Sequence, residues 1–344
     1  YEQGGDYRPE PKYFQGLLGA EINFDVVKNT YRITSIVRGD SWDEGKNSPL
    51  AAPGVGLKSG DVILAVNGQR ASQDVSLGAL LVNQAGNEVA LTVASAVAGK
   101  GEADERIVRI KPLRDEQMLY YRAWVNRNTA LVHSATGGKV GYVHVPNMGP
   151  WGYSEFFRAY LTESALDAMI VDVRFNGGGH VSQLLLEKLG RKRLGYDITR
   201  WAGAEPYPSY SILGPVVALT NEFAGSDGDI FSHCFKMMNL GTLIGKRTWG
   251  GVVGIHPRHA LADGSITTQP EFSFWFHDVG WAVENYGTDP HIEVDLAPQD
   301  YAAGRDAQLE RAIAEIQKQM QAAPPALPVF AARPNLALPK LPAA

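Results

Sequence analysis

The chain has 344 residues, a formal net charge of −5 at pH 7 and a hydrophobic fraction of 44%. This length is sufficient for two domains with separate cores. The mildly acidic balance gives no electrostatic reason to expect a nucleic acid or an anionic membrane as a partner. The eight histidines are scattered without metal-ligand spacing, so neither a metal nor another cofactor is expected.

Cysteine content and hydropathy bear on the compartment. The single cysteine, Cys234, excludes an internal disulfide and favours a reducing, cytoplasmic location. No apolar run reaches transmembrane length, and no basic-then-apolar signal peptide opens the chain. The first residue is Tyr1 rather than Met, so we expect the sequence to be part of a longer protein.

The first third of the chain predicts short strands separated by turns, after a polar stretch over residues 1–15. Val, Ile and Thr enrichment and alternation predict strands and one short amphipathic helix. The expected strands are residues 22–26, 31–37, 61–68, 88–97 and 106–110, and the helix is 76–83. An Asn-Gly pair at 67–68 favours a tight hairpin turn. These elements predict a small β-rich unit over residues 16–114.

From about residue 115 the pattern changes to strands that alternate with helices. Strands are expected at 139–145, 166–175 and 215–220, and helices at 153–163, from the glycine turn to 190, at 226–238 and at 305–321. A strand followed by a glycine-rich turn and a helix is typical of an open α/β domain, here residues 115–322. Residues 323–344 hold six prolines and no acidic residue, and we expect this tail to be disordered.

Two segments of the β-rich unit resemble a PDZ domain. Residues 56–68, GLKSGDVILAVNG, resemble the PDZ signature, a glycine-bounded turn that leads into a core strand. Residues 16–19, GLLG, resemble the loop with which such domains hold a peptide's terminal carboxylate on backbone N–H groups, and the next strand would accept the peptide. Gly19 stands where these loops usually carry a bulky residue, and PDZ units in proteases often serve as spacers. Peptide binding and a structural role therefore both stay open.

The turn NEFAGSDG at residues 221–228 joins an apolar strand to a helix and carries Ser226 at the helix start. Free N–H groups and the helix dipole favour negative charge there, which suits a nucleophile whose attack creates an oxyanion. The alternative is that Ser226 only caps the helix, because serine is a favoured N-cap residue.

The segment DVRFNGGG at residues 172–179 also ends an apolar strand and opens a helix. Three glycines allow a backbone to approach a ligand closely and to point N–H groups at it. A plain tight turn or a phosphate-binding loop are alternatives. However, the Walker lysine-serine pair is missing and the glycine spacing is not the dinucleotide fingerprint.

Together these segments resemble the tail-specific and tricorn family of serine peptidases. That family has a strand ending in Asp-x-Arg-x-Asn-x-Gly-Gly, followed later by a strand-to-helix turn with the nucleophilic serine. Further segments that fit are YGTDPHIEV at 286–294 and GRDAQL at 304–309, and the closest likeness to tricorn lies in GGDY at 4–7 and WAVEN at 281–285. The resemblance implies a β-β-α catalytic domain related to the crotonase and Clp-protease architecture, plus the PDZ domain.

The resemblance also implies roles for individual residues. Ser226 would be the nucleophile, and the backbone N–H groups of Gly179 and Asp227 would form the oxyanion hole. Gly178 would replace Gly179 if the register is off by one. Glu284 would orient the catalytic histidine, although by itself it reads as a surface carboxylate.

Asp197 falls where tricorn has an aspartate that attracts a basic P1 side chain from a neighbouring subunit. The alternative is an ion pair with one of the basic residues close in sequence, which are Arg191, Lys192, Arg193 and Arg200.

The general-base histidine of the family has no match among the 344 residues. The resemblance places it in a Ser-His pair ahead of the stretch similar to residues 1–7, upstream of Tyr1, so residues 1–15 would be the remnant of an N-terminal catalytic subdomain. His180, beside the glycine turn, is the candidate substitute within the chain. Without its base the isolated chain is expected to be weakly active or inactive.

The function implied is that of a cytoplasmic serine endopeptidase or oligopeptidase that hydrolyses unfolded peptides by acyl transfer. Family members assemble as homo-oligomers, and a hexamer is the expected form of the full-length protein. The alternative is a non-catalytic, PDZ-containing peptide-binding scaffold. Acyl-CoA chemistry on the related crotonase fold is disfavoured by the PDZ unit.

Overall fold

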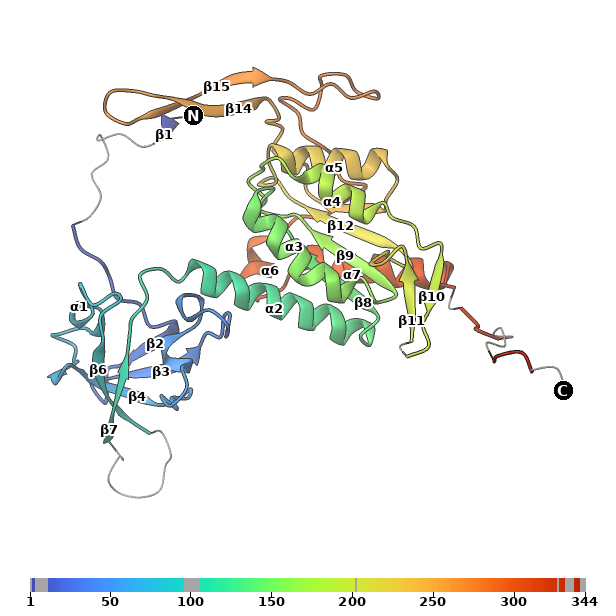
Figure 1. Ribbon diagram of the computed structural model, residues 1–344. Helices are drawn as coiled ribbons and strands as arrows, with labels where there is room; N and C mark the ends of the chain where they lie inside the picture. Colours follow the sequence, from blue (N-terminus) through green and yellow to red (C-terminus); the bar gives the residue numbers. More distant parts are fainter. Residues whose placement is uncertain are drawn as a thin grey trace. The chain divides into compact units, whose positions relative to one another are not determined.

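The computed structural model of the protein describes residues 2–3, 12–95, 105–201, 203–326, 328–331 and 337–340 (Figure 1). The chain divides into two compact units. Unit 1 comprises Tyr1–Leu131 and Pro257–Gln269, and unit 2 comprises Val132–His256 and Pro270–Ala344. The tricorn-like GGDY sequence at 4–7 lies outside the described residues.

Unit 1 is built on an antiparallel sheet of short strands in the order β2-β3-β4-β6-β7. The strands are β2 (Ala20–Asp25), β3 (Thr30–Ile36), β4 (Val62–Val66), β6 (Val89–Ala94) and β7 (Glu105–Ile110), with β5 (Gln69–Arg70) paired to β4. Alternate side chains such as Ile33, Ile63 and Leu91 are fully buried and form the core of the unit. The predicted β-rich unit is confirmed.

The hairpin turn predicted in unit 1 is present, but the helix of this unit is shorter than predicted. Asn67 and Gly68 both have positive φ, 50° and 80°, as a type I′ hairpin turn requires. Helix α1 spans only Leu77–Leu80, capped by Ser76, instead of residues 76–83. The helix does not continue to residue 83, because Asn83 has a φ of 59°, in the left-handed region. Two single-turn 3-10 helices lie between β3 and β4, at Glu44–Lys46 and Pro49–Ala51.

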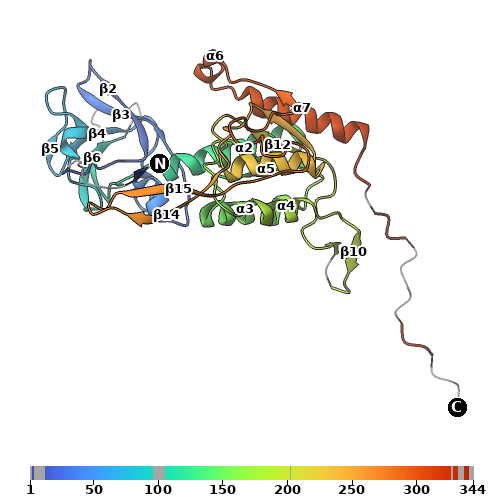
Figure 2. The same cartoon turned by 90° about the horizontal axis from the view of Figure 1, so that it is seen from above.

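Unit 2 contains a parallel five-stranded sheet in the order β16-β13-β12-β9-β8. Its strands are β8 (Val140–His144), β9 (Ala168–Asp172), β12 (Val216–Thr220), β13 (Thr242–Gly245) and β16 (Ile292–Glu293). Helices α3 (Pro150–Glu163), α4 (Ser182–Leu189) and α5 (Asp227–Met237) cover one face and α7 (Ala307–Ala322) covers the other (Figure 2). Burial on both faces explains why β8, β9 and β12 read as continuous apolar runs.

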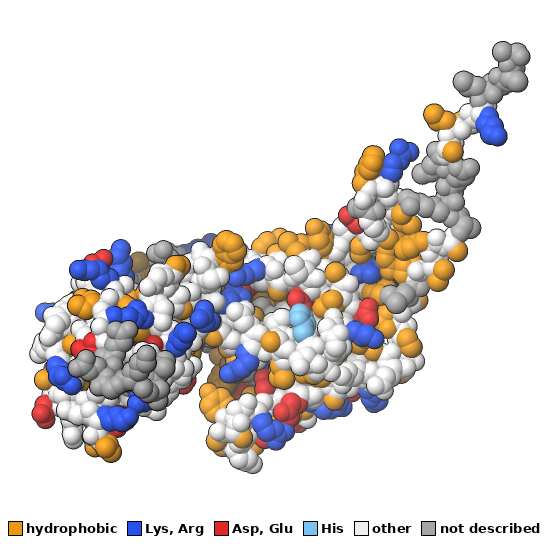
Figure 3. Space-filling model, turned by 90° about the horizontal axis from the view of Figure 1, so that it is seen from below, with side chains coloured by type: hydrophobic (Ala, Val, Ile, Leu, Met, Phe, Trp, Pro, Cys, Tyr) orange, Lys and Arg blue, Asp and Glu red, His pale blue; other side chains and the backbone are white. Residues whose placement is uncertain are grey.

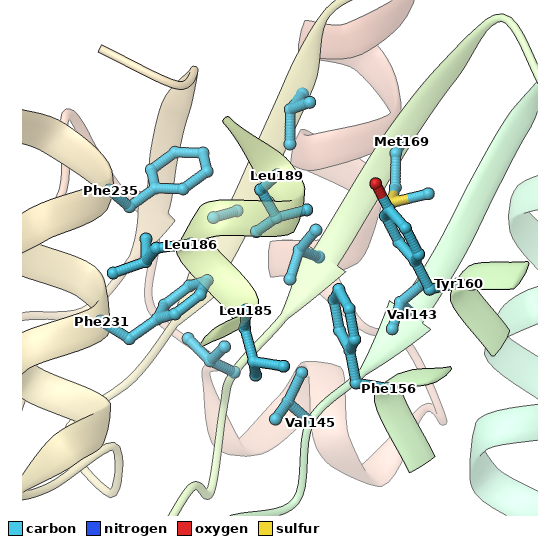
Figure 4. Close-up of a cluster of buried hydrophobic side chains, with 14 of the residues drawn as sticks. Val143, Val145, Phe156, Tyr160, Met169, Leu185, Leu186, Leu189, Phe231 and Phe235 are labelled. Carbon is cyan, nitrogen blue, oxygen red and sulfur yellow. The ribbon is translucent and has the colours of Figure 1, made fainter. Parts of the chain in front are cut away.

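The core of unit 2 lies between the sheet and helices α3, α4 and α5. Figure 4 shows Phe156 and Tyr160 of α3 and Phe231 and Phe235 of α5 on either side of leucines from α4. The rings of Phe156 and Tyr160 are stacked, with centroids 4.7 Å apart. This packing holds the first residues of α4 and α5 against the sheet. The predicted fold class, an α/β catalytic domain with a small β-rich PDZ domain, is confirmed by the two units and by the comparisons reported below.

Several elements were not predicted from the sequence. They are β5, β13 and β16, whose bounds are given above, and β1 (Glu2–Gln3), α2 (Gln117–Thr136), β10 (Gly195–Ile198), β11 (Ala204–Tyr207), β14 (Gly254–Ala260), β15 (Ile266–Phe272) and α6 (Pro298–Ala302). Strand β1 pairs with β15. In α2 the buried positions recur at helical spacing, but two of them are the polar residues Arg122 and Asn128. The apolar residues of α2 therefore do not recur every 3.6 residues without a break, and the sequence lacks the pattern that predicts an amphipathic helix.

The C-terminal tail makes contacts in its described part. The ring of Phe330 lies 5.5 Å from that of Tyr196, edge to face. Disorder of residues 323–344 stays a prediction.

On the face of the molecule shown in Figure 3, basic, acidic and hydrophobic side chains are interspersed. Across the described ranges, no helix has both the length and the apolar character needed to span a bilayer.

Candidate active site

The glycine turn and the serine turn meet at one edge of the parallel sheet. Strands β9 and β12 are neighbours, so their carboxyl ends lie side by side and bring the two turns together. Gly225 N donates to Asn176 O at 2.9 Å. A Cβ added to Gly178 would lie 2.6 Å from Ser226 Cβ, so only glycine allows this approach.

Ser226 has an unusual backbone conformation at the start of α5. Its φ of 55° and ψ of −119° are rare for a non-glycine residue and cost about 1–3 kcal/mol, a strain that clusters at functional sites. Its side chain makes no hydrogen bond that caps the helix. The alternative reading, in which Ser226 only caps α5, is therefore wrong.

The side chain of Asp227 ties the two helix starts together. Its carboxylate accepts hydrogen bonds from the backbone N–H of Ser182, at 2.9 Å, and from the Ser182 hydroxyl. Ser182 is the first residue of α4, so Asp227 satisfies free N–H groups of that helix while standing at the start of α5. Two positive helix ends thus converge beside Ser226.

The backbone donors of the glycine turn are not equally available. Gly178 N donates to Asn176 Oδ1 at 2.9 Å, and His180 N donates to Met148 O at 2.7 Å. In the part of the chain that the structure describes, the N–H groups of Gly179 and Asp227 donate to no other protein atom. Of Gly178 and Gly179, it is therefore Gly179 whose N–H group has no acceptor among the described residues.

Residue 179 must be glycine for a steric reason. A Cβ there would lie 2.0 Å from Met148 O, inside any allowed contact, and the φ of 149° disfavours other residues. Met148 N in turn donates to Gly178 O at 2.8 Å. The turn is thus held by backbone hydrogen bonds on both sides while the N–H of Gly179 stays free.

A cleft of about 510 Å³ opens beside these donors. One part of its lining is polar and includes Ser226, His180 and Gln183. The other part is apolar and is formed by Ile230, Val252, Ile255, Phe272 and Phe274. A pocket that combines an apolar wall with a few convergent polar groups suits the side chain and backbone of a peptide.

Glu284 lies behind the wall of this cleft. Its Oε2 accepts the backbone N–H groups of Val252, at 2.6 Å, and Val253, at 2.8 Å. Val252 lines the cleft, so the half-buried carboxylate supports the wall directly. The interpretation of Glu284 as an isolated surface carboxylate does not fit these contacts.

A second buried carboxylate near Ser226 escaped the sequence analysis. Asp229 is fully buried in the first turn of α5, and its Oδ1 accepts the N–H of Gly250 at 2.8 Å. Among the described residues, Oδ2 of Asp229 has no hydrogen-bond partner. Burial raises the pKa of Asp229. Hydrogen bonds from the Thr248 hydroxyl and from backbone N–H groups act in the opposite direction, but burial has the larger effect. An acidic residue in a first helical turn is so common that the sequence offered no signal.

Asp172 and Arg174, which precede the glycine turn, form a buried ion-pair network. Arg174 is 1% exposed and pairs with Asp172, at 2.7 Å, and with Asp306, at 2.8 Å. Asp306 also caps α7 by accepting the N–H of Leu309. Burial alone would raise the pKa of Asp172, but the Arg174 guanidinium lowers it overall. The pair therefore locks the end of β9, and with it the glycine turn, to α7.

Asp197 is not among the described residues that line the cleft. It is exposed on β10, opposite Glu205 of β11. Of the basic residues proposed as its partners, Arg191 pairs with Glu187, Arg193 donates to Ser211 O and Arg200 lies over the ring of Trp201. Among the described residues Asp197 has no ion pair, so the ion-pair alternative does not hold.

The eight histidines are all described, and His180 lines the cleft with its ring 6.0 Å from that of His256. Four others have partners of their own: His133 with Glu163, His144 with Arg174 O, His233 with Asp278 and His291 with Leu243 N. A search of the described residues found no group of three or more side chains that could hold a metal ion.

Comparison with known proteins agrees with this arrangement. Residues 16–115 match the tricorn protease PDZ domain, and residues 139–294 match peptidase family S41. The chain is 44% identical over 313 residues to the tricorn protease of Thermoplasma acidophilum, covering 91% of this chain and 28% of that protein. It is 46% identical over 321 residues to a tricorn protease homolog of Saccharolobus solfataricus, covering 93% and 29%.

A solved structure is also similar. The crystal structure of the tricorn protease superposes with a TM-score of 0.85 at 43% identity, over 93% of this chain and 30% of that one. The chain spans about a third or less of the length of the curated relatives it matches. The chain thus combines a tricorn protease PDZ domain with a peptidase family S41 domain, and it is similar to the tricorn protease over 93% of its length.

Proposed function

We propose that the chain carries the nucleophile and the oxyanion hole of a serine peptidase. Ser226 Oγ attacks the peptide carbonyl carbon, and the oxyanion that forms is held by the N–H groups of Gly179 and Asp227. The observation that supports this most is the pair of unused backbone donors beside a strained serine that makes no cap hydrogen bond. One such donor is typically worth about 10²–10³ in kcat.

The electrostatics of the turn favour this chemistry. The first residues of α4 and α5 meet at the site, so two helix dipoles stabilise developing negative charge. The side chain of Asp227 is turned onto Ser182 and held there by two hydrogen bonds. Its backbone N–H is thereby left for the substrate.

The general base belongs to the same proposal. By the family resemblance, a histidine in sequence that precedes Tyr1 takes the proton from Ser226, and Glu284 orients it. Since Oε2 of Glu284 holds two backbone N–H groups, Oε1 is the oxygen left for that histidine. His180, which lines the cleft, is the competing base within this chain.

Substrate preference and assembly follow from the placement of Asp197. An exposed carboxylate that has no ion pair among the described residues and does not line its own cleft suits an interaction with a basic P1 side chain in a neighbouring copy of a homo-oligomer. The apolar wall of the cleft suits apolar side chains of unfolded peptides. A hexamer and a cytoplasmic location remain part of the proposal.

A phosphonate probe that reacts with activated serines tests the proposal. It would be applied to this chain and to the longest natural protein that contains it, each as wild type, Ser226→Ala and, as control, Ser154→Ala, whose serine is exposed on α3. Labelling that is lost only in Ser226→Ala supports the peptidase. Labelling of this chain alone that disappears in His180→Gln would assign the base to His180. Absence of labelling in both proteins would favour the non-catalytic scaffold.

A further inference from the structure

The PDZ loop at residues 16–19 already holds a carboxylate, and that carboxylate belongs to the chain itself. Gly19 N donates to Oε1 of Glu116 at 2.6 Å, a short distance typical of charge-assisted hydrogen bonds. Glu116 is partly buried and immediately precedes helix α2. All of these residues belong to unit 1. The loop thus binds a side-chain carboxylate, the same chemical group as a peptide C-terminus.

The other donors of the loop are largely engaged as well. Gly16 N donates to Leu81 O and Leu17 N donates to Leu113 O, both at 2.9 Å. With Gly19 occupied by Glu116, three of the four N–H groups of the loop have partners inside the unit. A peptide carboxylate needs several such donors at once, and it would have to displace these partners.

Helix α2 also accounts for the unusual glycine in the loop. Leu119, one turn after Glu116, is 1% exposed. A Cβ on Gly19 would lie 2.8 Å from Leu119 Cδ2 and 2.8 Å from Ser48 Cβ. The φ of Gly19 is +64°, which also disfavours a larger residue. The space in which PDZ loops usually carry a bulky residue is therefore filled by Leu119 and Ser48.

An internal ligand has an advantage over a free peptide. Because Glu116 is tethered to the loop through the same polypeptide, its binding is intramolecular, with an effective concentration of about millimolar or higher. A peptide with modest affinity would not compete. By contrast, β2 is the terminal strand of its sheet, and strand addition there would need no terminal carboxylate.

We propose that Glu116 is the internal ligand of the PDZ loop, with Leu119 as its apolar partner. The loop is closed to peptide C-termini, and its task in this chain is to anchor the start of helix α2. This inference concerns unit 1 and holds whether or not Ser226 is a nucleophile.

The test compares two fluorescent peptides that end in leucine and differ only in having a free C-terminal carboxylate or a C-terminal amide. Binding is measured to the full chain in a Ser226→Ala background, so that hydrolysis cannot remove the probe. The variants are Glu116→Ala, Glu116→Gln, and Glu88→Ala as control, because Glu88 is an exposed carboxylate of the same unit. Glu116→Asp, which withdraws the carboxylate by one methylene, replaces the alanine variant if that variant does not fold.

We expect the chain with intact Glu116, and the Glu88→Ala control, to bind both peptides equally, because the loop is occupied. Glu116→Gln should behave in the same way, since its side-chain oxygen can still accept from Gly19. Glu116→Ala should prefer the acid over the amide by about tenfold, the factor that one charge-assisted hydrogen bond provides. A preference for the acid in the chain with intact Glu116 would overturn the proposal. So would equal binding of both peptides by Glu116→Ala, because the loop would then not be a carboxylate site.

Discussion

Two glycine-containing loops, one in each unit, use their backbone N–H groups in opposite ways. In residues 16–19 the N–H of Gly19 is bound by Glu116, and two more donors are satisfied within the unit. In residues 177–180 the N–H groups of Gly178 and His180 are also satisfied, but that of Gly179 is left free beside Ser226.

The difference shows that glycine content alone does not make an anion site. Glycine allows a close approach of the backbone. The neighbouring elements then decide whether an N–H group donates to a protein acceptor or remains available to a ligand. In unit 1 the neighbour is the carboxylate of Glu116, immediately before α2. In unit 2 it is a cleft of about 510 Å³.

The largest effect should come from removing the hydroxyl that faces the free donors. In the longest natural protein containing this chain, Ser226→Ala should reduce peptide hydrolysis by about 10⁴-fold or more, the scale typical of a lost triad member. The melting temperature should hardly change, because Ser226 makes no cap hydrogen bond. Activity assays and thermal unfolding check both statements, with Ser154→Ala as control. Activity near that of the wild type would reject Ser226.

The second-largest effect on kcat should distinguish the N–H of Gly179 from the other residues of the glycine turn. Gly179→Ala should lower kcat by about 10²–10³-fold, because its Cβ would collide with Met148 O and displace the N–H. Gly177→Ala is a matched control, since a Cβ there meets nothing within 4 Å. Steady-state kinetics of both variants give the comparison. Equal losses would show that the turn is sensitive to any added side chain, and the assignment of Gly179 would lose its support.

A smaller and more selective effect is expected at Asp197. Asp197→Asn should lower kcat/KM for substrates with Lys or Arg at P1 by about 10–100-fold, and hardly at all for Leu or Phe, if the carboxylate meets the basic side chain. Glu205→Gln, directly across the β10–β11 ribbon, is the control. The same loss on both substrate types would point to a structural role for Asp197.

The smallest effect concerns Asp229, which accepts the N–H of Gly250 as Glu116 accepts that of Gly19. Its pKa is raised by burial, so the folded state holds the proton more tightly than the unfolded state. Stability that this group contributes is present below the unfolded pKa of about 4 and is lost as pH rises through the folded pKa.

Relative to Asp229→Asn, the wild type should therefore lose stability as the pH rises from about 4 through the folded pKa, on the order of 1 kcal/mol for each unit by which the pKa is raised. Urea unfolding across this pH range measures it. The exposed Glu222→Gln, in the same turn, is the control and should track the wild type. Parallel pH profiles for Asp229→Asn and the wild type would contradict the buried, ionisable state of Asp229.

Much of the fold and the outline of the site could be predicted from local sequence. Continuous apolar runs fit strands buried on both faces, and Asn67-Gly68 fits its turn. Helix α2 could not be predicted, because buried Arg122 and Asn128 interrupt its apolar period. The β10–β11 and β14–β15 hairpins are largely exposed and carry little apolar alternation.

What the sequence by itself determined is the type of each unit and the family, because signatures such as GLKSGDVILAVNG and DVRFNGGG are local and depend on turns and strand ends. Tertiary structure alone decided which backbone donors remain free. Gly178 and Gly179 are adjacent glycines, and the sequence does not distinguish them. In the described part of the chain, the N–H of Gly178 donates to Asn176 Oδ1, whereas the N–H of Gly179 has no protein acceptor. The hydrogen bond from Gly19 to Glu116 joins residues 97 positions apart. The availability of an N–H group depends on what packs against it, and no local pattern records that.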